Sequence, residues 1–373
     1  MGPAALSDAE RLDWLRLIRS ENVGPVTFLQ LLQRYGSPAA ALSALPDLAR
    51  RGGRASLRIA TRADAEREMD ATTTAGARLV ARGEPDYPAG FTTIYDAPPL
   101  VSMRGRAALG ADPARVVAIV GARNASGVGV RFARTLAADL GAKGLVVASG
   151  LARGIDAAAH TGALASGTIA MLAGGIDKPY PPENKPLYAE MVEGGLVIAE
   201  QPVGTEPHGR HFPRRNRLIS GVSCGVVVVE AALHSGSLIT ARIALEQGRE
   251  VFAVPGSPLD PRCRGTNNLL REGATLVEEA DDVVRALTGL RTLREPAGDG
   301  YSVTTAATPK DFGEEEVGTA RAQIVELLSP SPVPVDELIR QSRLTPAIVL
   351  TILLELELAG RLQRHPGNQV SLL

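Results

Sequence analysis

Two arginine-bearing segments of this chain combine residue types that bind phosphate. The first is Gly121-Ala122-Arg123-Asn124-Ala125-Ser126-Gly127, which lies between an apolar run, Val116–Val120, and a helical pattern. A glycine-containing loop at a strand-to-helix turn lets an anion approach backbone amides, and arginine adds a planar fork of donors. The segment is not a P-loop, because no Gly-Lys-Ser/Thr follows, and Phe132 occupies the third glycine position of a dinucleotide fingerprint. The residues expected to contact phosphate are Gly121, Arg123, Ser126 and Gly127.

The second segment, 208–217, is the densest basic stretch in the chain and reads His-Gly-Arg-His-Phe-Pro-Arg-Arg-Asn-Arg. Its arginines can neutralise phosphates, while the ring of Phe212 can stack on a base without selecting its identity. Four arginines exceed the needs of one phosphate group, which favours single-stranded nucleic acid over a small nucleotide. Pro213 biases the preceding residue towards an extended backbone and so predicts a loop that presents the ring. The expected contacts are Phe212, Arg214, Arg215, Asn216 and Arg217.

Two further loops follow apolar runs and open helical patterns. One begins at Ser149-Gly150, and the other is Ser235-Gly236-Ser237. Backbone amides and hydroxyls at such turns can hold an oxyanion. The residues expected to contribute here are Ser149, Gly150, Arg153, Ser235, Gly236 and Ser237.

An enzymatic alternative uses the same region. Asp156 and His160 are one helical turn apart, and Glu230 ends an apolar run, so these groups could serve a nucleotide-binding hydrolase. We favour a helix-start carboxylate and a packed histidine, because no serine–histidine–acid order or metal-ligand spacing accompanies them. The two cysteines, Cys224 and Cys263, lie in no close Cys or His cluster. We therefore expect no catalytic residue, no metal and no cofactor.

Alternating strand and helix patterns must position these loops. Strands are expected at 116–120, 145–149, 168–172, 196–200, 225–230, 250–254 and 275–277, with helices clearest at 128–140, 155–165, 237–247 and 267–271. This alternation predicts an α/β fold with a parallel, doubly wound sheet, whose ligands bind at the carboxyl ends of the strands. Residues 101–105 predict a short edge strand before it.

Helical segments flank the predicted sheet. Residues 1–85 read as helical: Ser7 and Glu10 form a capping box for a helix over 8–18, and Val23-Gly24-Pro25-Val26 turns into a second helix over 27–35. This pair resembles a helix-hairpin-helix unit, whose turn can meet a DNA backbone. The turn carries little positive charge, so we favour a helical packing module.

The C-terminal part has the outline of a winged helix. Helices are expected at 320–328, 336–341 and 346–359, followed by a hairpin over 361–372. The third helix would be the DNA reader, but it is apolar and acidic, which favours a protein-contact module. The polar composition of 290–318 predicts a linker. The predicted domains are 1–85 (helical), 86–289 (Rossmann-like), 290–318 (linker) and 319–373 (winged-helix-like).

The composition indicates in which compartment the protein works and which kinds of partner it can have. The chain has 373 residues and a formal net charge of -1, so an anion-binding surface must be local. No apolar run approaches a membrane span and no signal peptide is visible. Two cysteines fit a reducing compartment. We expect a cytoplasmic protein without a membrane partner.

Several of these segments together resemble the DprA/Smf family of DNA-processing proteins. The matching stretches are Ile119–Arg123, Ser149–Asp156 with Ala159-His160, Tyr180-Pro181 with Glu183-Asn184, Phe212–Arg217, Ser235–Ala241 and Gly248–Gly256. They cover about residues 87–280 in the family's order, and the set is specific.

The resemblance implies an extended Rossmann fold between an N-terminal helical SAM-like module and a C-terminal winged-helix-like module. It implies a homodimer that binds single-stranded DNA, protects incoming strands, helps replace single-strand-binding protein and loads the RecA recombinase in natural transformation. It carries strand binding onto Arg123, Phe212, Arg215, Asn216 and Arg217. It supplies no catalytic residue.

Overall fold

The computed structural model describes residues 5–293, 314–365 and 367–373. These residues form two compact units. The sheet unit contains residues 68–94 and 100–293, and the terminal unit contains residues 6–67 and 95–99 together with the described residues from 314 onward. Most of the predicted linker, residues 294–313, lies outside the described residues.

The sheet unit is built on a mixed sheet whose described strands run in the order β1-β2-β6-β5-β4-β3-β7-β8-β9. Strands β3 to β9 run parallel to one another, whereas β2 is antiparallel to both of its neighbours, β1 and β6. Strand order reverses around β3, which is the doubly wound arrangement expected from the sequence. The strands are β1 (Arg78–Ala81), β2 (Leu100–Gly105), β3 (Val116–Val120), β4 (Val146–Ser149), β5 (Thr168–Leu172), β6 (Leu196–Ala199), β7 (Gly225–Val228), β8 (Glu250–Ala253) and β9 (Thr275–Leu276).

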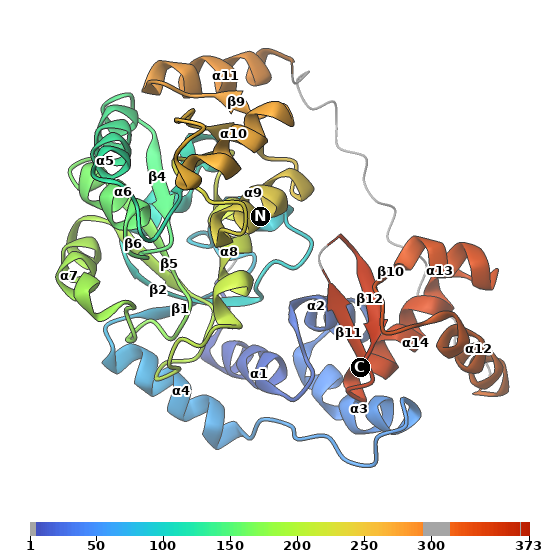
Figure 1. Cartoon of the computed structure of the whole chain (residues 1–373). Coiled ribbons are helices and arrows are strands. Elements are labelled where there is room, and N and C mark those ends of the chain that lie inside the picture. The colour runs from blue at the N-terminus through green and yellow to red at the C-terminus, as the bar shows by residue number, and fades with distance from the viewer. Residues whose placement is uncertain (1–4, 294–313, 366) are drawn as a thin grey trace. The chain divides into compact units, whose positions relative to one another are not determined.

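Helices cover both faces of this sheet, as Figure 1 shows. Alternate residues of a strand point to opposite faces, and the central strands are apolar on both, as a doubly covered parallel sheet requires. Val117 and Ile119 pack with α5 and α6, whereas α8 lies against the face that carries Met171. The helices of this unit are α5 (Gly127–Ala142), α6 (Ile155–Ala163), α7 (Lys185–Gly194), α8 (His211–Val222), α9 (Gly236–Glu246), α10 (Arg264–Arg271) and α11 (Ala280–Leu293).

Three elements differ from the sequence-based expectations. β1 lies inside the region expected to be helical to residue 85, where it pairs with β2. β2 is not an edge strand, because it lies between β1 and β6. Residues 211–222 form helix α8 rather than a loop. Proline is tolerated in the first turn of a helix, where backbone amides have no intrahelical acceptor, so Pro213 is compatible with a helix there.

The terminal unit combines helices from both parts of the chain. Its N-terminal helices are α1 (Asp8–Arg19), α2 (Pro25–Tyr35) and α3 (Pro38–Arg51), and α4 (Arg62–Thr74) continues into the sheet unit. The expected capping box is confirmed: Ser7 Oγ accepts from the amide of Glu10, whose carboxylate accepts from the amide of Ser7. The expected winged helix follows as α12 (Glu314–Leu327), β10 (Val333–Pro334), α13 (Val335–Ser342), α14 (Pro346–Leu358), β11 (Leu362–His365) and β12 (Gln369–Leu372).

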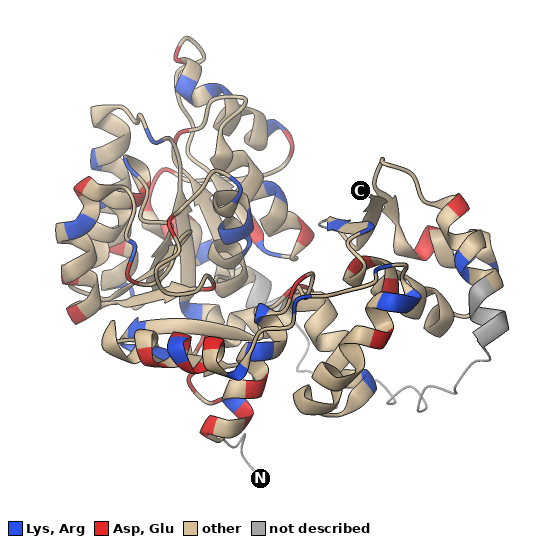
Figure 2. Ribbon diagram, turned by 90° about the horizontal axis from the view of Figure 1, so that it is seen from below, with Lys and Arg blue, Asp and Glu red and all other residues tan. Residues whose placement is uncertain are grey.

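Charges are distributed without one dominant sign. Figure 2 shows Lys and Arg segments interspersed with Asp and Glu segments over both units, in line with the net charge of -1. Any site for a polyanion must therefore come from a local arrangement of side chains. The helices in the described part of the chain include none with the length and apolar character needed to cross a bilayer.

His160 on α6 joins β4, β5 and the following loop through one hydrogen-bonded chain. The amide of Leu151 donates to His160 Nε2 at 3.3 Å, and Nδ1 lies 2.8 Å from Thr168 Oγ1, whose hydroxyl donates to the Val147 carbonyl at 2.6 Å. This pattern assigns the proton of a neutral imidazole to Nδ1. Leu151 has a positive φ of 55°, a conformation that the histidine stabilises. The histidine is structural, as we expected.

We expect this histidine to make stability depend on pH. Burial lowers the pKa of His160 to about 3, from an ordinary value of 6.5. Between these values the unfolded chain binds the extra proton, so the stabilisation is fully present above about pH 6.5 and is lost as the pH falls through that window. The slope contributed by this group is at most about 1.4 kcal/mol per pH unit.

Denaturant unfolding at several pH values between neutral and about 5 measures this slope. His160→Gln should flatten it, because glutamine keeps a neutral acceptor for Leu151. The same change at the exposed His234 is the matched control and should leave the slope unaltered. Parallel profiles for the wild type and His160→Gln would show that His160 is not the titrating group.

Candidate nucleic-acid interface

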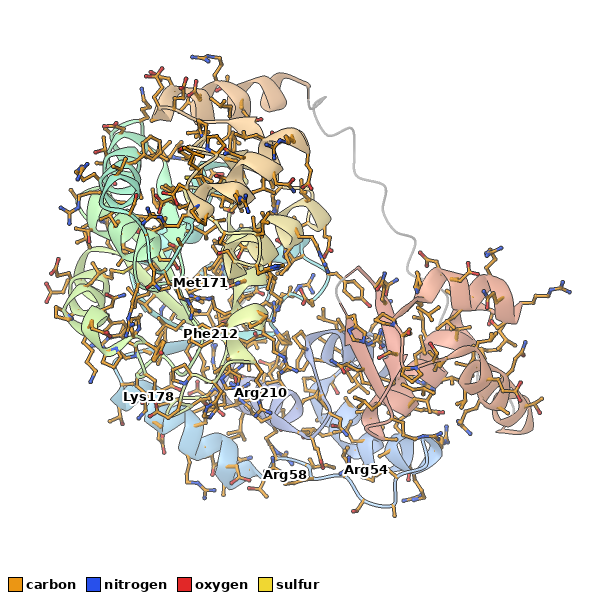
Figure 3. All side chains as sticks on the ribbon, viewed as in Figure 1. Arg54, Arg58, Met171, Lys178, Arg210 and Phe212 are labelled. Carbon is orange, nitrogen blue, oxygen red and sulfur yellow. The ribbon has the colours of Figure 1, made fainter. Side chains whose placement is uncertain are left out.

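The four segments singled out in the sequence meet at one edge of the sheet unit. Three of them follow the parallel strands β3, β4 and β7, and the basic segment 208–217 contains the start of α8. Doubly wound sheets bind ligands at the carboxyl ends of their parallel strands. Figure 3 labels Met171 on β5 and Phe212 at the start of α8. A buried arginine connects three of these elements.

Arg215 lies beneath this edge rather than on its surface. Its Nη1 donates to the Met171 carbonyl at 2.6 Å and also to the Gly150 carbonyl, so α8 is fastened to the ends of β4 and β5. Burial lowers the pKa of Arg215 to about 10, and the group therefore stays charged near neutral pH. A side chain at Gly150 would collide with the guanidinium. We expected Arg215 to pair with phosphate, and its burial contradicts that expectation.

Asp156 provides the negative charge near Arg215. Its carboxylate accepts from the amides of Gly150 at 3.2 Å and Ala152 at 3.4 Å, which fixes the loop after β4. Burial raises the pKa of Asp156, and the positive charges of Arg215 and Arg123 act against that rise. The carboxylate thus bonds the amides of the loop and interacts electrostatically with the Arg215 guanidinium. It is buried and therefore not exposed for acid–base chemistry.

The exposed part of the edge is an arginine–aromatic cluster of Arg123, Phe212 and Tyr180. The guanidinium carbon of Arg123 lies 4.8 Å from the centroid of the half-buried Phe212 ring, within cation–π range. Tyr180 meets that ring edge-on at 5.7 Å and is itself 43% exposed. Within the described residues, no acidic side chain forms an ion pair with Arg123. The cluster therefore offers a fork of donors that forms no ion pair among the described residues, beside two rings.

Three more basic or polar residues, which were expected to contact the strand, differ in their exposure and in their bonding partners. Arg214 is exposed, and no ion pair of it is found in the part of the chain that the structure describes. Arg153 forms a surface pair with Glu183 at 2.5 Å, each side chain being 57% exposed, so a phosphate can compete for it. Asn216 Nδ2 points to the Gly236 carbonyl at a long 3.5 Å.

The expected anion site at the start of α5 is filled by the protein's own carboxylate. Glu230 accepts from the amide of Ser126 at 2.9 Å and from its hydroxyl at 2.5 Å, while Ser126 Oγ caps the helix by accepting from Gly129. A carboxylate at a helix N-terminus satisfies the same donors that a phosphate would need. The expected contact between Ser126 and phosphate is therefore contradicted, because Glu230 already occupies the donors of Ser126. Gly127, the next residue, is exposed.

Other expected contact residues have interior roles. The Ser149 hydroxyl is fully buried and donates to the Ile119 carbonyl at 2.6 Å. Arg217 is buried and bonds Glu200 at 2.5 Å. A Cβ at Gly121 would approach Ile155 to 2.6 Å, so this glycine is explained by close packing of α6. Ser149, Gly150 and Arg217 were expected to contact the DNA strand directly. Their buried positions contradict that expectation.

The turn before α9 has an exposed glycine, Gly236, between the half-buried Ser235 and the buried Ser237. Ser235 caps the helix by accepting from the amide of Ser237 at 3.3 Å, and the two hydroxyls lie 2.7 Å apart. Gly236 is exposed, with open space where a Cβ would be. These three residues remain candidates for a backbone contact to phosphate.

The groups of the enzymatic alternative are all engaged. Asp156 holds loop amides, His160 is neutral within its chain of bonds, and Glu230 caps α5. Among the described residues, no three His, Cys, Asp or Glu side chains are grouped so as to hold a metal ion. None of these three groups is therefore free for acid–base work.

Tyr180 and Asn184 were absent from the expected site. Asn184 Nδ2 donates to the Leu151 and Ala152 carbonyls at 2.9 and 3.2 Å, which joins the loop after β5 to the loop after β4. An aromatic residue in a loop that follows a predicted parallel strand is the signal that could have identified Tyr180.

Comparisons with known proteins match three stretches of the chain to domains of one family. Residues 78–288 match the family described as DNA recombination-mediator protein A, residues 8–71 match the DprA-like N-terminal HHH domain, and residues 308–368 match the DprA winged helix domain. Protein Smf of Escherichia coli is 40% identical over 69% of this chain and 67% of its own length. DNA processing protein DprA of Bacillus subtilis is 42% identical over 57% of this chain and 72% of its own length.

Solved structures agree with the sequence matches. DNA processing protein A from Streptococcus pneumoniae aligns with a TM-score of 0.61 at 34% identity, over 76% of this chain and 98% of that one. DNA processing protein A from Helicobacter pylori, whose structure is described as showing a single-stranded DNA binding mode, aligns at 0.53 with 29% identity over 58% of this chain and 98% of that one. The order of modules, the doubly wound sheet and these matches agree, and the chain belongs to the DprA/Smf family of DNA recombination-mediator proteins.

Proposed function

We propose that this protein binds single-stranded DNA at the arginine–aromatic cluster. We propose that it acts as a recombination mediator and does not catalyse a reaction on the strand. The observation that supports this most is the position of Arg123 over the ring of Phe212, 4.8 Å from its centroid, at the ligand-binding edge of the sheet. An exposed guanidinium suits phosphate, and exposed rings suit bases of any identity. The single-strand binding mode described for the Helicobacter pylori relative supports the same assignment.

The buried residues define what the site can recognise. Because Arg215 and Asp156 fix the loop after β4 from below, the cluster is held on a rigid base. Contacts then come from side chains that carry no hydrogen-bond pattern specific to one base, so we propose binding that is largely independent of sequence.

Membership of the family supports a proposal about the wider role. We propose that the protein protects incoming single strands, helps replace single-strand-binding protein and loads RecA during natural transformation, in the cytoplasm and as a homodimer. Self-association is supported by exposed apolar side chains near α9, among them Leu233, Ile239 and Leu245.

Replacing Arg123 with alanine should weaken oligo-dT binding and reduce its salt dependence. For single strands, each phosphate that the protein no longer neutralises lowers the slope of log affinity against log salt by about 0.7. Arg285→Ala is the matched control, since Arg285 is an exposed arginine of α11 paired with Asp282. Fluorescence anisotropy across a salt series measures both quantities. Wild-type affinity and slope in Arg123→Ala would place the strand elsewhere.

Removing either ring should weaken binding without changing the salt slope. Phe212→Ala and Tyr180→Ala should each cost about 1–3 kcal/mol if the ring stacks on a base, because a ring neutralises no phosphate. Phe212→Tyr and Tyr180→Phe keep the rings and should retain most of the affinity.

Unfolding of the free variants separates stacking from packing. If Phe212→Ala lowers the melting temperature and leaves oligo-dT affinity at the wild-type value, the ring is a packing residue and not a stacking platform.

A further inference from the structure

Helix α14 of the winged helix is buried on two faces. The first contributes Ile348, Ile352 and Leu356 to the core of the winged helix. The second carries Thr351, Leu354, Glu355 and Leu358, at positions i, i+3, i+4 and i+7 of one stripe. Leu354 is 2% exposed and Glu355 and Leu358 are 0% exposed, although none of the three belongs to that core.

The second face of α14 lies against the N-terminal helices (Figure 1). Arg34 of α2 donates to the Thr351 hydroxyl at 3.3 Å. Asn22, in the turn between α1 and α2, donates its side-chain amide to the Leu358 carbonyl at 3.0 Å. Hydrogen bonds thus fasten both ends of the stripe.

Gly52, just after α3, lies close against the backbone of α14. A Cβ there would lie 2.0 Å from the Glu355 carbonyl oxygen and 2.8 Å from Ala359 Cβ. Gly52 has an ordinary φ of -71°, so its lack of a side chain is explained by this contact and not by its backbone. The wing strand adds a further bond, from Arg364 Nη2 to Gln30 Oε1 at 3.3 Å.

These contacts use the elements by which each module would meet DNA. A winged helix presents its third helix to a groove, and a helix-hairpin-helix unit presents its turn to the backbone. Here the third helix covers α2 and α3, and the turn residue Asn22 bonds the end of that helix. We infer that α14 is a docking helix for the chain's own N-terminal helical module, and that this docking keeps α14 out of DNA grooves.

The chemistry of the docked face supports this assignment. Glu355 is buried, and its Oε2 accepts from Arg321 of α12 at 2.5 Å. Exposing this stripe would present a carboxylate and leucines to a polyanion, which opposes groove binding. The same residues suit a packed contact between helices.

Thiol labelling of the full chain tests the docking. Leu354→Cys lies on the docked stripe, and Leu350→Cys, 37% exposed on the same helix, is the matched control. Peptide-resolved mass spectrometry separates either thiol from Cys224 and Cys263. We expect Cys at 354 to react at least about tenfold more slowly, because a buried thiol reacts only through local opening. Equal rates in a folded variant would overturn the inference.

A glycine pair tests the contact without a new thiol. Gly52→Ala places a methyl group against the α14 backbone, whereas Gly24→Ala meets nothing within 4 Å. Hydrogen exchange should rise in α3 and α14 for Gly52→Ala only, while α1 stays protected. An unaltered exchange pattern in Gly52→Ala would contradict the docking, even if Leu354→Cys failed to fold.

A duplex oligonucleotide distinguishes docking from DNA reading. We expect added duplex to leave the labelling of Leu350→Cys and the exchange of α14 unchanged in the full chain. Protection of α14 by the duplex would show that this helix reads DNA, and the inference would then fail.

Discussion

A buried positive charge connects the elements at the carboxyl ends of β4 and β5 in the sheet unit. The guanidinium of Arg215 is removed from water, bonded to the Gly150 and Met171 carbonyls and balanced electrostatically by Asp156. Burial of one charge without its partner costs about 3–5 kcal/mol, so each of these groups depends on the others. Because Arg215 and Phe212 share the first turns of α8, the two bonds of Arg215 Nη1 also fix the position of the half-buried Phe212 ring.

This arrangement explains how far sequence could predict the site. Arg123 and Arg215 have the same side chain and both lie in stretches that match the family, yet one is exposed and the other is interior. Their difference arises from α8 lying over β5, a contact between segments about forty residues apart that no local pattern contains. Glu230 and Ser126 are separated even further in the chain, so the filling of the α5 N-terminus by a carboxylate could not be inferred from the loop alone.

The fold was more predictable than the site because its signals are local. Apolar runs predicted β3 and β5 to the residue, since both faces of these strands are covered. The prediction failed at β1, where a short apolar stretch gains strand structure only by pairing with β2. It failed at α8 because Pro213 was taken to favour an extended loop, whereas proline is tolerated in the first turn of a helix, where Pro213 lies. The composition of α14 favoured a protein-contact module over a DNA reader, but it could not indicate that this helix packs against α2 and α3 of the same chain.

The terminal unit is discontinuous in sequence, and this has a consequence for biosynthesis. Residues 6–67 pack with residues beyond 314, and the sheet unit lies between them in the chain. At about 5–20 residues per second, the partner of α3 leaves the ribosome tens of seconds after α3 itself. During that interval the surface around Gly52 is uncovered while the sheet unit can already fold. The nascent chain can therefore carry a folded sheet unit while its terminal unit still lacks α14.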